Sequence, residues 1–275
     1  MSDAIHATIA ALHVYPIKSC RGIALASARL TPTGLADDRH WMVVRPGGRF
    51  VTQRELPRMA LIVTALNGFA LTLDAPGMSP LAVSREQSGD SSAVTVWGFT
   101  GRGIDCGEAA ALWVTGFLGT PLRLMRFDTS APRECDPTWA GDVPAVTEFA
   151  DGFPILVISR ASLAELNSRL PKALPMERFR PNLVLEGIDA YDEDRIHELR
   201  GEGVALRLVK PCLRCVITTT EQSTGERDGV EPLAMLKSYR FDADLRGVMF
   251  GQNAIIVAGV GALLREGQKL EVVWK

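Results

Sequence analysis

The chain has 275 residues, of which 47% are hydrophobic and 23% are charged, a composition typical of a soluble globular protein with one or two domains. Its net charge of −2, with both signs interspersed, gives no basic footprint, so we expect no nucleic-acid partner. The N-terminus lacks a signal-peptide pattern, and the longest apolar run, residues 254–264, is too short to span a bilayer. The five cysteines lack the spacing of a disulfide framework. We therefore expect a cytoplasmic protein without a membrane segment.

Short strands dominate the first half of the chain. Residues 7–14 are predicted to form the opening strand, which ends at Tyr15-Pro16 because proline removes a backbone donor. The following turn, residues 17–22, carries two cations, and such a turn either binds an anion or lies in solvent. Extended segments then alternate with turns up to residue 97, and Asn67-Gly68 predicts a type I′ hairpin. This regular pattern favours a β-barrel or a β-sandwich.

Two polar clusters, residues 37–41 and 52–54, interrupt this pattern. They are either exposed ends of strands or parts of a site that faces the second half of the chain. Residues 106–118 are predicted to form the first helix, which ends at Gly119. Cys106 at its start is either activated by the helix dipole or a packed, inert thiol.

The second half is also rich in predicted strands. A polar connector follows the strand at 121–127, so we place the domain boundary at residues 125–145 and divide the chain into domains 1–125 and 126–275. Further strands are predicted at 154–158, 183–185, 205–209, 254–257 and 270–274. Helices are predicted at 162–170, where Ser162 and Glu165 have capping-box spacing, and at 231–239. The predicted fold is mainly β with a few helices (α+β), built from two barrel-like domains.

The most informative stretch is residues 210–220, where Cys212 and Cys215 stand at C-x-x-C spacing. Zinc is disfavoured because the other cysteines and the histidines are scattered singly, and an iron–sulfur cluster needs more cysteines at close spacing. A thioredoxin-like pair needs a helix directly after it, whereas residues 216–220 have strand propensity. The residues leave two interpretations, one reactive or metal-binding thiolate at the end of a strand, or two small buried hydrophobic side chains.

Six short motifs stand in the same order as in a known family. They lie at residues 15–19, 34–39, 178–182, 212–219, 236–240 and 250–253. Together they resemble MOSC proteins, in particular the group with an N-terminal β-barrel domain that includes the mitochondrial amidoxime reducing component and its bacterial relatives. Because the motifs run from residue 15 to residue 253, the resemblance covers nearly the whole chain.

The resemblance implies a molybdenum cofactor, with a mononuclear molybdenum held by a molybdopterin-type pterin and by Cys215. A thiolate suits such a metal, and arginine suits a phosphate. The resemblance also implies a catalytic place near the metal for Asp151. The residues implied to bind the cofactor are Lys18, Ser19, Arg39, Arg180, Asn182, Arg214 and Asn253.

The implied activity is the reduction of small N-hydroxylated substrates such as amidoximes, hydroxylamines and N-hydroxylated bases. Some bacterial relatives carry a C-terminal ferredoxin domain, and this sequence lacks the cysteine spacing of such a cluster. We therefore expect a separate electron-donor protein of the ferredoxin, flavodoxin or cytochrome b5 type with its reductase. Other readings stay open: a sulfur carrier or sulfurtransferase acting through Cys215 or Cys212, a protein that only binds or carries the cofactor, and a zinc-stabilised barrel.

Overall fold

The computed structural model describes residues 5–86 and 89–275. Residues 1–4, which we expected not to begin a signal peptide, lie outside that part of the chain. Four α-helices occur in the described residues: α1 (Glu108–Leu118), α2 (Pro137–Ala140), α3 (Arg160–Arg169) and α4 (Leu233–Tyr239). No helix there is long and apolar enough to cross a membrane. Strands make up most of the remaining regular structure, which confirms the prediction of a mainly β fold with a few helices.

Seven strands close into a barrel. In order around it they are β14 (Ile155–Ser159), β15 (Leu183–Glu186), β1 (His6–Val14), β23 (Lys269–Trp274), β16 (Ile196–Gly201), β17 (Val204–Leu213) and β21 (Gly247–Ala258). Pairing of β21 with β14 completes the ring, and only the β14–β15 pair is parallel. All seven strands contribute buried apolar side chains to one cluster, among them Ile9 and Leu12 of β1. Burial of this alternating face stabilises the barrel.

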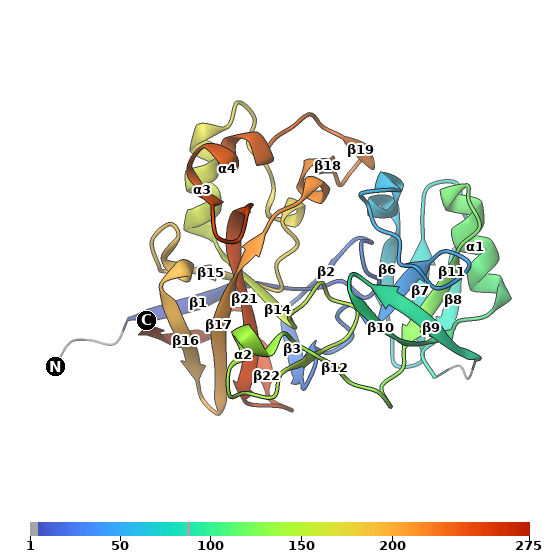
Figure 1. Cartoon of the computed structure of the whole chain (residues 1–275), viewed down its shortest axis with the longest axis horizontal. Coiled ribbons are helices and arrows are strands. Elements are labelled where there is room, and N and C mark those ends of the chain that lie inside the picture. Colours follow the sequence, from blue (N-terminus) through green and yellow to red (C-terminus); the bar gives the residue numbers. More distant parts are fainter. Residues whose placement is uncertain (1–4, 87–88) are drawn as a thin grey trace.

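The opening strands belong to this barrel side of the molecule. Strand β2 (Ile23–Leu25) pairs with β1, and β3 (Ser27–Thr31) pairs with both β4 (Gly34–Leu35) and β22 (Leu263–Arg265). Figure 1 shows β1 in blue beside the orange and red strands of the second half. The chain therefore starts on the barrel, contacts the other body through Ile17 and Cys20, returns to the barrel side in β2 to β4, and enters the other body again at β5. The division at residues 125 and 126 stays a prediction.

The other body holds two smaller sheets. One contains β5 (Trp41–Val44), β11 (Arg123–Phe127), β10 (Phe99–Asp105) and β9 (Ser91–Val96). The second contains β6 (Val63–Leu66), β7 (Ala70–Asp74) and β8 (Leu81–Ser84). Helix α1 packs on β11 at the right of Figure 1, where its apolar residues join a buried cluster with side chains from both sheets.

Short elements complete the described chain. They are the strands β12 (Arg133–Glu134), β13 (Val146–Thr147), β18 (Thr220–Glu221), β19 (Glu226–Arg227) and β20 (Phe241–Asp242), and the 3-10 helices η1 (Pro57–Leu61), η2 (Met176–Arg178), η3 (Asp192–Asp194) and η4 (Val216–Thr219).

Three local predictions were wrong. Residues 216–219 form η4 instead of a strand, because the hydroxyls of Thr218 and Thr219 donate to carbonyl oxygens three residues back and stabilise a turn. Helix α3 starts earlier than predicted, since the Ser159 hydroxyl accepts a hydrogen bond from the Ser162 N–H and caps it. The β6–β7 hairpin exists, but its turn is not type I′, because neither Asn67 nor Gly68 has a positive φ.

Candidate functional site

One pocket between the two bodies collects every residue that the family resemblance implied for the site. Its walls include Lys18, Ser19, Arg39, Asp151, Arg180, Asn182, Arg214, Cys215 and Asn253, together with Cys212. These residues come from the turn after β1, the loops before β5, β14 and β15, the segment after β17, and β21. Cys106 lies elsewhere, in the buried core beside α1, where burial raises the pKa of its thiol to about 12. Cys106 is therefore a packed, inert thiol.

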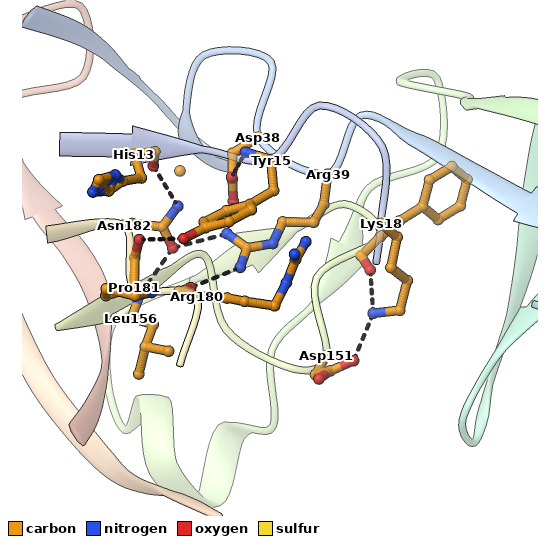
Figure 2. Close-up of polar contacts among 12 residues, drawn as sticks. His13, Tyr15, Lys18, Asp38, Arg39, Asp151, Leu156, Arg180, Pro181 and Asn182 are labelled. Atoms are coloured by element: carbon orange, nitrogen blue, oxygen red, sulfur yellow. Dashed lines mark hydrogen bonds and ion pairs between the residues drawn. The ribbon is translucent and has the colours of Figure 1, made fainter. Parts of the chain in front are cut away.

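Two arginines lie against the ring of Tyr15. The guanidinium carbon of Arg39 lies 4.3 Å from the ring centre and that of Arg180 lies 4.2 Å from it. The Tyr15 hydroxyl donates to the Pro181 carbonyl oxygen over 3.1 Å, as Figure 2 shows. Burial raises the pKa of Tyr15 to about 12, so the hydroxyl keeps its proton at neutral pH. The ring thus holds two cations in one place.

A polar network also holds Arg39 in place (Figure 2). Its Nη1 donates to Asp38 Oδ2 over 2.5 Å and to Asn182 Oδ1 over 3.0 Å. Asn182 Oδ1 also accepts from the Leu156 N–H, and Asn182 Nδ2 donates to the His13 carbonyl oxygen. The Asn182 side chain is therefore occupied in joining loops, which makes it a positioning residue in this arrangement.

Arg180 and Arg214 keep unpaired N–H groups at the pocket. Arg180 Nη1 donates to the Cys20 carbonyl oxygen over 2.7 Å, and Arg214 Nη2 donates to that of Phe179 over 2.7 Å. Arg180 Nη2 and Arg214 Nε are buried without a partner in residues 5–86 and 89–275. Burial lowers the pKa of Arg180 to about 10, so it remains charged at neutral pH. A buried cationic N–H group without a hydrogen-bond acceptor costs free energy. An anionic ligand would supply acceptors for both the Arg180 and the Arg214 groups.

Backbone strain is concentrated at the same place. Within the described residues, seven that are not glycine have a positive φ, and three of them, Ser19 (68°), Arg39 (51°) and Arg180 (57°), line the pocket. A fourth, Trp97 (54°), contacts Asp151 of the pocket wall. Such conformations cost about 1–3 kcal/mol each and cluster at functional sites. The strain therefore supports a ligand site here.

Lys18 and Asp151 form an ion pair on one wall. Lys18 Nζ donates to Asp151 Oδ1 over 2.5 Å and to the Phe149 carbonyl oxygen over 2.7 Å (Figure 2). Trp97 Nε1 also donates to Asp151 Oδ1, over 3.0 Å. Desolvation acts to raise the pKa of the Asp151 carboxyl, but the Lys18 ammonium and these hydrogen bonds outweigh it and hold the pKa well below its ordinary value. Asp151 is therefore ionised at neutral pH.

Each of the two thiols in the pocket has an arginine neighbour. Arg54 Nη1 lies 3.7 Å from Cys215 Sγ, and Arg214 Nη1 lies 2.9 Å from Cys212 Sγ. Cys215 directly precedes η4, and Cys212 belongs to β17. The contact of Arg54 with Cys215 supports the interpretation that residues 52–54 face the second half of the chain.

No group of three or more His, Cys, Asp or Glu side chains that could hold a metal ion occurs in the described part of the chain. A metal at Cys215 would therefore need further ligands from another molecule. A sulfur-rich anionic cofactor meets this need, and the unpaired arginine N–H groups fit its anionic parts.

Several residues of this site had no predicted role. Tyr15 and Asp38 lie inside two of the quoted motifs and Arg54 lies in a noted polar cluster, so a signal existed for each. Trp97 was predicted only as the end of a strand. Its place beside Asp151 depends on a contact between residues 54 positions apart, which no local pattern indicates.

Fold and site together define a β-barrel protein with a pocket of arginines and thiols suited to an anionic, metal-bearing ligand. Comparison with known families matches residues 6–121 to the MOSC N-terminal beta barrel domain and residues 144–271 to the MOSC domain. The chain is 38% identical over 244 residues to mitochondrial amidoxime reducing component 2 of Rattus norvegicus, which covers 85% of this chain and 72% of that protein.

Two other relatives agree. Mitochondrial amidoxime-reducing component 1 of Homo sapiens is 39% identical over 244 residues, with 85% of this chain and 72% of that protein covered. Component 1 of Mus musculus is 36% identical over 261 residues, with 90% and 76% covered. The chain belongs to the MOSC family, in the group whose MOSC domain follows an N-terminal β-barrel domain, as the six motifs predicted.

Proposed function

We propose that this protein is a molybdenum cofactor-dependent reductase of N-hydroxylated compounds that receives electrons from a separate donor protein. The observation that carries the proposal is the pocket itself, where two thiols and two arginines with unpaired N–H groups meet. The relatives are named for amidoxime reduction, which supports the same chemistry here. A donor of the ferredoxin, flavodoxin or cytochrome b5 type would complete the system.

The candidate ligands divide the work of holding the cofactor. Cys215 would supply the thiolate to molybdenum, and the Arg54 guanidinium would stay in contact with that sulfur. Arg180 and Arg214 would donate their free N–H groups to phosphate or to the polar edge of the pterin. When bound, the cofactor supplies two-electron redox chemistry at molybdenum.

Other residues would prepare the pocket for the substrate. Lys18 Nζ donates to the Phe149 carbonyl oxygen and to Asp151 Oδ1, which fixes the direction of the carboxylate. Asn253 Nδ2 donates to the Lys210 carbonyl oxygen over 3.2 Å, so it holds β21 against the segment that carries Cys212. Ser19, with its strained backbone, and Lys18 would close the wall that faces the cofactor.

The test is reduction of benzamidoxime by the cofactor-loaded protein with a chemical electron donor, measured as benzamidine by chromatography. We expect Cys215→Ala to lower the rate about 100-fold or more, because Cys215 would no longer offer its thiolate to the metal, and the matched control Cys212→Ala to lower it less than about tenfold. Equal losses would contradict the assignment of Cys215. A chain that holds the cofactor but reduces nothing would instead be a cofactor carrier.

A further inference from the structure

Trp97 is an exposed indole held in a strained position. It occupies the turn between β9 and β10, has a φ of 54° and is 53% exposed. A bulky residue with such a φ is uncommon. Because much of the indole is exposed, its burial contributes little hydrophobic free energy to offset that strain. The structure nevertheless fixes this side chain at the edge of the pocket, which suggests a purpose other than packing.

Three contacts hold the indole in place. The Arg54 guanidinium carbon lies 4.2 Å from the centre of the indole, the Phe50 ring centre lies 5.3 Å from it, and the indole N–H donates to Asp151 Oδ1. Arg54 is itself anchored, because its carbonyl oxygen accepts from Arg227 Nη2 over 2.9 Å and its Nη1 contacts Cys215 Sγ. The exposed indole is thus tied to the acidic wall and to the thiol at once.

The neighbouring carboxylate has one oxygen free. Asp151 Oδ1 accepts both the Lys18 and the Trp97 hydrogen bonds, while Oδ2 has no hydrogen-bond partner among the described residues. The Asp151 side chain is 68% exposed. An aromatic surface beside a free carboxylate oxygen is complementary to a flat group that carries N–H donors or a positive charge and is joined to a ring.

We propose that Trp97 and Asp151 form the substrate-recognition face of the pocket and select amidine-type groups attached to an aromatic ring over aliphatic ones. Asp151 Oδ2 accepts N–H donors from the amidine part, and the indole contacts the ring. Arg54 and Phe50 are positioning residues that keep the indole in place. The inference rests on the proposed function, since it names the class of compound that the reductase takes.

Binding of two amidines, neither of which can be reduced, distinguishes the contact of Asp151 with the amidine group from the contact of Trp97 with the ring. Benzamidine and acetamidine share the cationic amidine, and only benzamidine has a ring. Their dissociation constants for the purified cofactor-loaded protein are measured by titration calorimetry. We expect wild type to prefer benzamidine by about tenfold, and Trp97→Ala to bring that ratio close to one. Asp151→Asn should weaken both amidines by a similar factor and keep the ratio.

Further variants serve as controls for this measurement. Phe69→Ala removes another aromatic side chain of the same body, 87% exposed and outside the pocket lining, and should leave the ratio unchanged. Trp97→Phe should keep most of the preference for benzamidine. Trp97→Leu, which keeps a bulky side chain that is not aromatic, should lose that preference. Trp97→Leu also replaces Trp97→Ala if the alanine variant does not fold. A ratio that survives both Trp97→Ala and Trp97→Leu, or no preference in wild type, overturns the inference. Neither amidine is reduced, so this binding test does not depend on reductase activity. A protein that lacks reductase activity would contradict the proposed function and leave the result on amidine recognition unaffected.

Discussion

Tyr15 offers a way to disturb the pocket without changing a candidate ligand. Its ring contacts the guanidinium groups of both Arg39 and Arg180, its hydroxyl donates to the Pro181 carbonyl oxygen, and it is only 2% exposed. Tyr15→Phe removes the hydroxyl and keeps the ring that contacts both arginines. Tyr15→Leu removes both. The difference between the two variants therefore isolates the contribution of the stacked ring.

The expected magnitudes follow from these contacts. Loss of the hydrogen bond in Tyr15→Phe should lower the free energy of unfolding by about 1 kcal/mol. Tyr15→Leu also loses two desolvated cation–π contacts of about 0.5–2 kcal/mol each, so it should lose roughly 1–4 kcal/mol more. It should also bind less cofactor, because both arginines lose the aromatic contact that helps the hydrogen bonds hold them.

Urea unfolding of the cofactor-free protein, followed by circular dichroism, measures these free energies. Pterin fluorescence of the purified protein measures cofactor retention. If Tyr15→Leu and Tyr15→Phe were equally stable and retained equal amounts of pterin, the argument that the ring fixes the two arginines would be refuted.

Two further predictions concern stability. The pKa of Asp151 lies below the ordinary value of 3.8, so its ion pair with Lys18 stabilises the fold above that pH and stops doing so as the pH falls through the lowered pKa. The difference in the free energy of unfolding between wild type and Asp151→Asn should therefore become smaller on acidification. A difference that becomes larger would contradict this. Gly251→Ala should cost about 2–5 kcal/mol, because its φ is +82° and a Cβ would lie 2.8 Å from the Val157 carbonyl oxygen. The control Gly261→Ala, with a φ of +91° but open space, should cost only about 1–2 kcal/mol, and equal costs in thermal unfolding would show that the close contact does not matter.

Much of the fold could be predicted from local patterns. The alternation in residues 7–14 and the apolar run at 154–158 correspond to β1 and β14, and residues 106–118 contain α1. These elements are long or strongly patterned, so neighbouring residues determine them. The strand predicted at residues 216–220 was wrong because β-branched side chains favour strands, whereas two threonine hydroxyls here donate hydrogen bonds to the backbone and stabilise a turn.

The site could be predicted only through the family resemblance. Nothing in the composition of the turn at residues 17–22 places Lys18 against Asp151, which is 133 positions away in the chain. Likewise, the pairing of the opening strands with the second half follows from long-range packing and not from local propensity. The free oxygen of Asp151 and the strained indole of Trp97 are properties of the assembled pocket, so they became visible only in the structure.

The central claim is that this pocket holds a molybdenum cofactor through Cys215. Its most direct test is the molybdenum and pterin content of the purified wild-type chain, by elemental analysis and by pterin fluorescence. The account predicts about one molybdenum and about one pterin per chain. A chain with neither, carrying sulfane sulfur on Cys215 or Cys212 instead, would contradict the claim and make the protein a sulfur carrier.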